Sequence, residues 1–308
     1  MTTLLDMINE VSINLSGYTL QQDRATHITA NVAATASTIA APITLSLAST
    51  DSVGKGIIEI DEELLWVDNY DRVGNTATIA PYGRAYLGTT LAAHTAGTKV
   101  TIAPTFPRFV IKRAINDTIN AIGSSIFAAK STTITSNSSV AAFRLPATGN
   151  SLNIRSILSV AYESIGPSKE WIPIRNYRFD GNANAGAFSS EQTISIYNAI
   201  TSGRTIQIVY STDPTPFTDN AEIFATQTGL PSSCKDLVIL GATYRLLSNL
   251  DPARASMVSP QADEVDSKRP YGSSQSLTKQ VYALFNQRLN EEIKNQQDKY
   301  PIRVHYSL

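Results

Sequence analysis

The chain has 308 residues, of which 42% are hydrophobic and 17% are charged. This hydrophobic fraction allows a buried core and excludes a wholly disordered chain. The 25 basic and 26 acidic residues give a formal net charge of −1. We therefore do not expect the chain as a whole to bind nucleic acid by electrostatic attraction. The single cysteine, Cys234, excludes an intrachain disulfide and a cysteine-based zinc site. Without a membrane-length apolar run or a basic N-terminal region, we expect synthesis in the cytoplasm without export.

Four segments carry apolar side chains at helical spacing. They cover residues 3–15, 107–128, 234–249 and 276–298. In the first, Leu4, Ile8 and Leu15 fall on one helix face. Pro107 suits the first turn of the second helix, and Pro301 follows the last one. The sequence therefore predicts four amphipathic helices.

Between these helices the hydrophobic pattern changes to a period of two, which is typical of strands. The first group of short alternating segments covers residues 43–47, 56–60, 64–67, 76–80 and 99–103. The second group covers residues 140–145, 156–165, 171–179, 192–200 and 205–211. Turn residues such as glycine and asparagine separate the segments of both groups. We therefore expect two β-rich modules between the helices.

This order of elements predicts an α+β fold, a split four-helix bundle with two inserted antiparallel β modules that are sandwich-like or barrel-like. Loops at the surface of a bundle tolerate insertions of this kind. The helical core would comprise residues 1–20, 106–130 and 215–308. The two β modules would comprise residues 21–105 and 131–214.

Two segments near the C-terminus do not fit this scheme. Residues 250–272 form a long polar connection with three prolines, and loops of this length are usually functional or disordered. The segment from Tyr300 to Leu308 alternates apolar and polar side chains, which is typical of a half-buried strand. Edge pairing with a neighbouring chain and a frayed terminus are both open interpretations of this tail.

The sequence contains no motif typical of a nucleotide-binding loop, a zinc site or a serine nucleophile. An acidic cluster is the best candidate for an active or metal site. Its members are Glu59, Asp61, Glu62, Glu63, Asp68 and Asp71. Paired carboxylates can cleave glycosides by acid–base chemistry or bind calcium. We favour the solvated face and turn of a β hairpin, and we expect no catalytic residue, cofactor or metal.

Two further clusters have both a binding and a packing interpretation. Aromatic residues gather around Trp66, and aromatic strips can bind sugars, although packing within a β module is the interpretation that we favour. The helix that starts at Pro107 opens with the basic residues Arg108, Lys112 and Arg113. These three are candidates for contact with phosphate groups, although a solvated helix face is the more common reason for such a pattern.

Residues 56–103 resemble a segment that recurs in virion proteins of tailed bacteriophages. The physical interpretation of this segment is a hairpin, then a threonine-capped helical turn that ends near His94, then a return strand. His94 would brace the turn. The resemblance is carried by Glu63 before the strand at 64–67, the strand at 76–80, Gly83, Arg84, the run Leu87-Gly88-Thr89-Thr90, His94, Gly97 and the last strand.

The wider arrangement of amphipathic helices, a long loop and a strand-like tail is similar to that of head-to-tail adaptor (connector) proteins, and the role is similar to that of tail tubular proteins. This resemblance implies that the chain is a structural virion protein and not an enzyme. It would form a ring of about twelve copies between portal and tail. Double-stranded DNA would pass through the central channel without sequence recognition.

The same resemblance implies the partners and the residues that contact them. The partners would be the portal protein, other copies of the chain, and a tail or nozzle/stopper protein, with no membrane and with assembly in the host cytoplasm. Arg108, Lys112 and Arg113 would face the channel or the DNA phosphates. The residues that dock onto the portal or a neighbouring copy would be Tyr300, Ile302, Arg303, Val304 and Tyr306.

The two β modules depart from the simpler helical adaptors and leave alternatives open. The first alternative is another tail, baseplate or fibre-attachment protein with a carbohydrate-binding β module, which the aromatic residues around Trp66 suggest. The second is a carbohydrate-cleaving enzyme that uses the carboxylates of residues 59–71.

Overall fold

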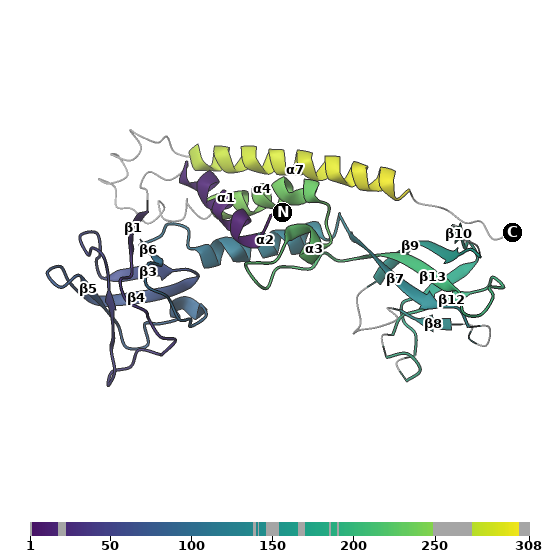
Figure 1. Cartoon of the computed structure of the whole chain (residues 1–308). Coiled ribbons are helices and arrows are strands. Elements are labelled where there is room, and N and C mark those ends of the chain that lie inside the picture. The colour runs from purple at the N-terminus through teal and green to yellow at the C-terminus, as the bar shows by residue number, and fades with distance from the viewer. Residues whose placement is uncertain are drawn as a thin grey trace. The chain divides into compact units, whose positions relative to one another are not determined.

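The computed structural model (Figure 1) describes residues 2–17, 23–137, 140, 142–145, 154–165, 170–184, 186–189, 191–248 and 273–301. The chain divides into two compact units. The sandwich unit comprises Met1–Leu4, Asn116–Val238 and Ala283–Leu308. The curved-sheet unit comprises Leu5–Ile115 and Ile239–Tyr282.

All four predicted helices are confirmed. They are α1 (Leu4–Ser16), α2 (Arg108–Ile122), α4 (Lys235–Leu247) and α7 (Ser273–Lys299). A short fifth helix, α3 (Phe224–Thr228), was not predicted. The predicted end of the second helix at residue 128 was wrong. The helix ends at Ile122, Gly123 follows it in close contact with Pro214, and a strand begins at Ala128. Among the described residues, no helix combines the length and the apolar character needed to cross a membrane.

The buried helix faces follow the predicted apolar stripes. Leu4, Ile8 and Leu15 of α1 are at most 1% exposed. Helices α4 and α7 contact each other within both units, through the ion pair of Asp236 and Arg288 in the sandwich unit and through an edge-to-face contact of two tyrosine rings in the curved-sheet unit. The split four-helix bundle stays a prediction, because the residues of α2, α4 and α7 are divided between the two units.

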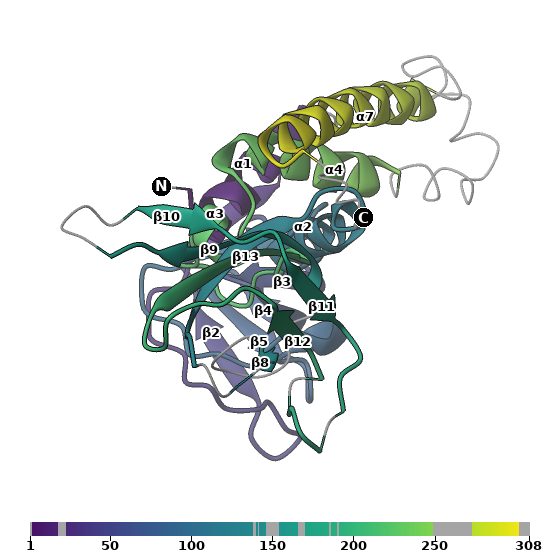
Figure 2. The ribbon, with the colours of Figure 1, turned by 90° about the vertical axis from the view of Figure 1, so that its right-hand side faces the viewer.

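The curved-sheet unit contains a six-stranded antiparallel sheet in the order β1-β6-β3-β4-β5-β2 (Figures 1 and 2). Its edge strands approach each other at an isolated bridge between Ile28 and Leu47. The sheet therefore curves around its hydrophobic core, but it does not close into the barrel that we considered. Its strands are β1 (Arg24–His27), β2 (Ile43–Ser46), β3 (Gly56–Ile60), β4 (Glu63–Asp71), β5 (Thr76–Ile79) and β6 (Lys99–Ile102).

The sandwich unit contains a four-stranded sheet, β10-β9-β13-β7, and a three-stranded sheet, β11-β12-β8 (Figures 1 and 2). Buried residues of both sheets, among them Val160, Ile194 and Ile208, form one hydrophobic cluster, as in a β sandwich. The strands are β7 (Ala128–Thr135), β8 (Ala142–Arg144), β9 (Ile154–Glu163), β10 (Trp171–Pro173), β11 (Tyr177–Asp180), β12 (Thr193–Ile196) and β13 (Thr205–Thr212).

The single strand predicted at residues 171–179 was wrong. It consists of β10 and β11, which belong to different sheets. Pro173 cannot donate a ladder hydrogen bond and ends β10. Ile174, which follows it, is 3% exposed and belongs to the shared hydrophobic cluster. Its backbone N–H still donates to Val160 of β9, and the chain passes to the other sheet between Ile174 and Tyr177, where β11 begins.

Candidate functional site

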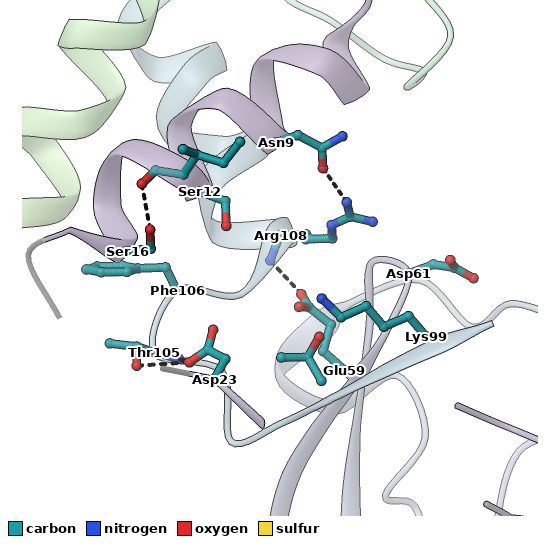
Figure 3. A pocket seen from close by; sticks show the side chains of 12 residues that line it. Asn9, Ser12, Ser16, Asp23, Glu59, Asp61, Lys99, Thr105, Phe106 and Arg108 are labelled. Carbon is teal, nitrogen blue, oxygen red and sulfur yellow. Dashed lines mark hydrogen bonds between the residues drawn. The ribbon is translucent and has the colours of Figure 1, made fainter. Parts of the chain in front are cut away.

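The predicted basic residue Arg108 lies at a polar cavity of about 660 Å³ in the curved-sheet unit (Figure 3). Arg108 is the first residue of α2, and its Nη2 donates a hydrogen bond to Oδ1 of Asn9 on α1 at 2.5 Å. The cavity is lined by Asn9, Ser12, Ile13, Ser16, Asp23, Glu59, Asp61, Lys99, Thr101, Thr105, Phe106 and Arg108. Its walls therefore carry charges of both signs.

The backbone N–H of Arg108 donates a hydrogen bond to Oε1 of Glu59 at 2.5 Å. The carboxylate lies at the N-terminus of α2, where the helix dipole favours a negative charge. Glu59 is 4% exposed. Burial raises the pKa of Glu59 to about 7, although the hydrogen bond from Arg108 opposes this rise. Glu59 therefore changes its charge near neutral pH.

The other two predicted phosphate-facing residues also lie on α2. Nζ of the half-buried Lys112 lies 3.1 Å from Oε2 of Glu62, while Arg113 is exposed. Arg108 and Lys112 thus each have an acidic side chain of the β3–β4 hairpin beside them. A nearby carboxylate offsets the attraction of a cation for phosphate. Contact of Arg108, Lys112 and Arg113 with DNA stays a prediction.

A buried charge network lies beneath the segment from Pro81 to His94, which we call the 81–94 loop. The carboxylate of Glu63 receives hydrogen bonds from Nε and Nη2 of Arg84, at 2.6 and 2.8 Å. His94 places Nε2 2.9 Å from Glu63 and Nδ1 2.9 Å from Asp61. Because both ring nitrogens face carboxylate oxygens, the ring is best satisfied as an imidazolium that donates twice.

The pKa values in this network are shifted in opposite directions. Burial alone would raise the pKa of Glu63, but the hydrogen bonds from Arg84, His94 and two backbone N–H groups outweigh it and lower the pKa to about 2. Burial alone would lower the pKa of His94, but its hydrogen bonds to Glu63 and Asp61 outweigh it and raise the pKa. The two negative and two positive charges of the network therefore balance.

The acidic cluster is thus only partly the solvated hairpin that we expected. Asp61, Asp68 and Asp71 are exposed, but Glu59 and Glu63 are buried. Burial is tolerated because each buried carboxylate receives hydrogen bonds, Glu63 from Arg84 and His94 and Glu59 from a helix N-terminus. Among the described residues, no group of three or more histidine, cysteine and acidic side chains is arranged to hold a metal ion.

The network fixes a loop with an unusual backbone. Tyr82, Ala85 and Leu87 all have positive φ angles, between 51° and 59°, which is costly for residues other than glycine. At Gly83 a Cβ atom would lie 2.9 Å from the carbonyl oxygens of Ala80 and Trp66, so the approach to β4 needs glycine. Tyr82 and Leu87 are 73% and 66% exposed. The loop therefore presents two apolar side chains on a rigid base.

The predicted helical turn is present only as a short segment, inside which Leu87 has non-helical backbone angles. It is the 3-10 turn η1 (Tyr86–Gly88), and Oγ1 of Thr89 donates to the carbonyl oxygen of Tyr86. His94 follows the turn, and its contacts with Asp61 and Glu63 connect this part of the chain to the β3–β4 hairpin. Of the aromatic residues near Trp66, Tyr86 contacts it, with ring centroids 5.3 Å apart. Sugar binding by these rings stays a prediction.

Of the predicted docking tail, the structure describes Tyr300, whose ring centroid lies 5.8 Å from that of Phe127. Ile302, Arg303, Val304 and Tyr306 lie outside the described residues, as does the long connection at 250–272. Sequence reasoning missed the partnership of Glu63 with Arg84 and the burial of Glu59. A signal for the pairing of Glu63 with Arg84 was that Glu63, Arg84 and His94 all belong to the segment that resembles bacteriophage virion proteins.

The chain matches a known protein family. The family model described as SU10 adaptor protein matches residues 84–305, which is more than half of the chain. The match begins at Arg84 of the buried charge network and includes α2, the sandwich and α7. No curated protein matches the chain.

Proposed function

The chain belongs to the SU10 adaptor protein family, and from this membership we propose that it is the head-to-tail adaptor that joins the portal to the tail. It is a structural adaptor protein of a bacteriophage virion. In our proposal about twelve copies form a ring, as heterologous contacts between identical subunits permit. DNA passes through the centre of this ring, and the protein has no catalytic role. The family match is the observation that carries this proposal.

Exposed apolar side chains support contacts with neighbouring subunits. Leu277 and Leu284 of α7 are 36% and 47% exposed and lie two helical turns apart on one face. Tyr82 and Leu87 of the 81–94 loop are two further exposed apolar side chains. Exposed apolar side chains on rigid elements are typical of protein interfaces. We propose that α7 contacts the next copy in the ring.

The charge distribution supports passage of DNA without tight binding. The whole chain has a formal net charge of −1. Glu62 lies beside Lys112 and weakens its attraction for phosphate, and the guanidinium of Arg108 donates a hydrogen bond to Asn9. Tight binding of DNA needs several uncompensated basic contacts. A channel lined by such paired charges would let DNA slide.

Leu284→Glu should abolish ring formation, because each subunit contact would then bury a charge without a partner. The measurement is mass photometry and negative-stain imaging of the full chain mixed with purified portal protein. Asn290→Glu adds the same charge at another exposed position of α7 and should leave rings intact. Rings formed by Leu284→Glu would exclude this α7 face as the contact. A wild-type chain that stays monomeric with portal would contradict the adaptor proposal.

A chain that ends at Pro301 should remain folded but lose binding to the portal. We propose that the alternating side chains of Ile302, Val304 and Tyr306 occupy pockets on the portal, with Arg303 beside them and Tyr300 at the base, while the backbone pairs with a strand edge. Co-sedimentation with purified portal measures the loss, and circular dichroism checks the fold. Binding equal to that of the full chain would show that the tail is not the docking element.

A further inference from the structure

The sandwich unit has an edge strand with an open side. β7 stands at the end of the order β10-β9-β13-β7, and all eight of its residues pair with β13. No other described strand pairs with it. The backbone groups on the outer side of an edge strand can accept a further strand. Side chains along β7 alternate, with Ile134 buried and Ser131 and Thr133 exposed.

The C-terminal end of α7 lies at the first residues of this strand. Nε2 of Gln296 donates to the carbonyl oxygen of Phe127 at 2.6 Å, and Oε1 of Gln296 accepts its backbone N–H at 3.1 Å. The rings of Phe127 and Tyr300 are in contact. A cavity of about 300 Å³ lies here, lined in part by Phe127, Ala129 and Tyr300. The chain beyond Tyr300 therefore starts beside the N-terminal end of β7.

The remaining segment matches the open edge in length and in pattern. Residues 302–308, which lie outside the described residues, have the sequence IRVHYSL. Seven extended residues span at most about 25 Å, and the eight residues of β7 span roughly 26 Å. Apolar residues at 302, 304 and 306 alternate with polar ones, as the buried and exposed positions of β7 do.

We propose that residues 302–308 pair with the outer edge of β7 of the same chain and form a fifth strand of the four-stranded sheet. The added strand runs parallel to β7, because it enters at the N-terminal end of β7. Ile302 and Val304 then extend the buried side that holds Ile134, and Arg303 lies on the exposed side with Ser131. The same-chain edge is favoured because the tail is tethered next to it, which raises its effective concentration into the millimolar range.

This inference concerns the free chain and therefore goes beyond the adaptor role. A tail bound to β7 cannot bind the portal at the same time, so portal binding would have to release it. The tests below use the chain without portal. Their failure would leave the adaptor proposal unaffected, and failure of ring assembly would leave this inference unaffected.

Hydrogen exchange of the full chain and of a chain that ends at Pro301 provides the first test. The outward-facing amides of β7 should exchange at least tenfold faster in the shortened chain, because they lose their hydrogen-bond partners. The amides of β10, at the opposite edge of the sheet, should exchange equally in both chains. Equal exchange in β7, or a change confined to β10, would overturn the proposal. The truncation removes none of the described residues, so it tests the edge in an intact sandwich.

Disulfide cross-linking identifies which copy supplies the tail. In a Cys234→Ser background, Ser131→Cys is combined with Arg303→Cys or with His305→Cys, all on the predicted exposed side. At least one pair should form a disulfide within a single chain, seen as a monomer of increased mobility on a non-reducing gel. Glu170→Cys, next to β10, is the matched control and should not cross-link to the tail. A ladder of covalent multimers, or no cross-link in either pair, would contradict pairing within one chain.

Discussion

Arg84→Met should lower the free energy of unfolding of the curved-sheet unit by about 3–5 kcal/mol, the usual cost of removing one partner from a buried ion pair. The side chains of Arg84 and Glu63 are 1% and 0% exposed. Methionine keeps most of the volume of the arginine side chain, but it removes the positive charge that pairs with the Glu63 carboxylate. The carbonyl oxygens of Ala33 and Ala92 also lose the hydrogen bonds that Arg84 donates to them.

Lys55→Met is the matched control for this variant. The ion pair of Lys55 and Asp68 has side chains that are 68% and 61% exposed, at 3.7 Å. Exposed pairs contribute at most about 1 kcal/mol. Urea denaturation at neutral pH measures both variants, followed by the fluorescence of Trp66 in a Trp171→Phe background, which removes the second tryptophan. Equal small losses would mean that Glu63 is not held as a buried carboxylate.

The sequence predicted the strands of this unit better than their polar contacts. Alternation placed β3 at its observed residues, and Ile58 and Ile60 lie in the hydrophobic core of this unit as the period of two predicts. It could not show that Glu63 is buried, since Arg84 and His94 lie 21 and 31 residues further along the chain. A buried carboxylate is predictable only when its partners are known, and those partners come from the tertiary fold.

The strands that sequence reasoning missed have weak local signals. β1 is mostly exposed over Arg24–His27, so it has no apolar alternation. β7 has the sequence AAKSTTIT, whose single large apolar residue, Ile134, gives no detectable period. Both strands are defined by their partners, β1 by β6 and β7 by β13. Pairing energy from a distant segment overrides local preference in such strands.

The shifted pKa values predict how pH changes the stability of the curved-sheet unit. Glu63 has a pKa lowered from 4.5 to about 2, so its contribution is present above pH 4.5 and is lost as the pH falls toward 2. His94 has a raised pKa, so its contribution is present below pH 6.5 and is lost as the pH rises through the higher value in the folded protein. The network is therefore most stable between these limits.

Glu59 adds a larger effect on the alkaline side. Its pKa rises from 4.5 to about 7, because burial disfavours the charged form. The folded protein therefore binds this proton more tightly than the unfolded chain does. The resulting stability is fully present below pH 4.5 and is lost as the pH rises through 7. A shift of this size corresponds to about 3 kcal/mol.

Glu59→Gln should therefore stabilise the protein at pH 8 by up to about 3 kcal/mol and have little effect at pH 4.5. Glutamine keeps an oxygen that can accept the N–H of Arg108, but it carries no charge that burial would penalise. Urea denaturation at both pH values measures the difference. Asp68→Asn, at an exposed carboxylate of the same sheet, should change stability little at either pH.

The opposite result at pH 8 would have a definite physical meaning. If Glu59→Gln were less stable than the wild type there, the attraction between the Glu59 carboxylate and the N-terminus of α2 would outweigh the cost of its burial. The cavity beside Arg108 would then hold a permanent negative charge, rather than one that is gained as the pH rises through neutrality. The same measurement therefore determines the charge beside Arg108, which we proposed as a channel residue.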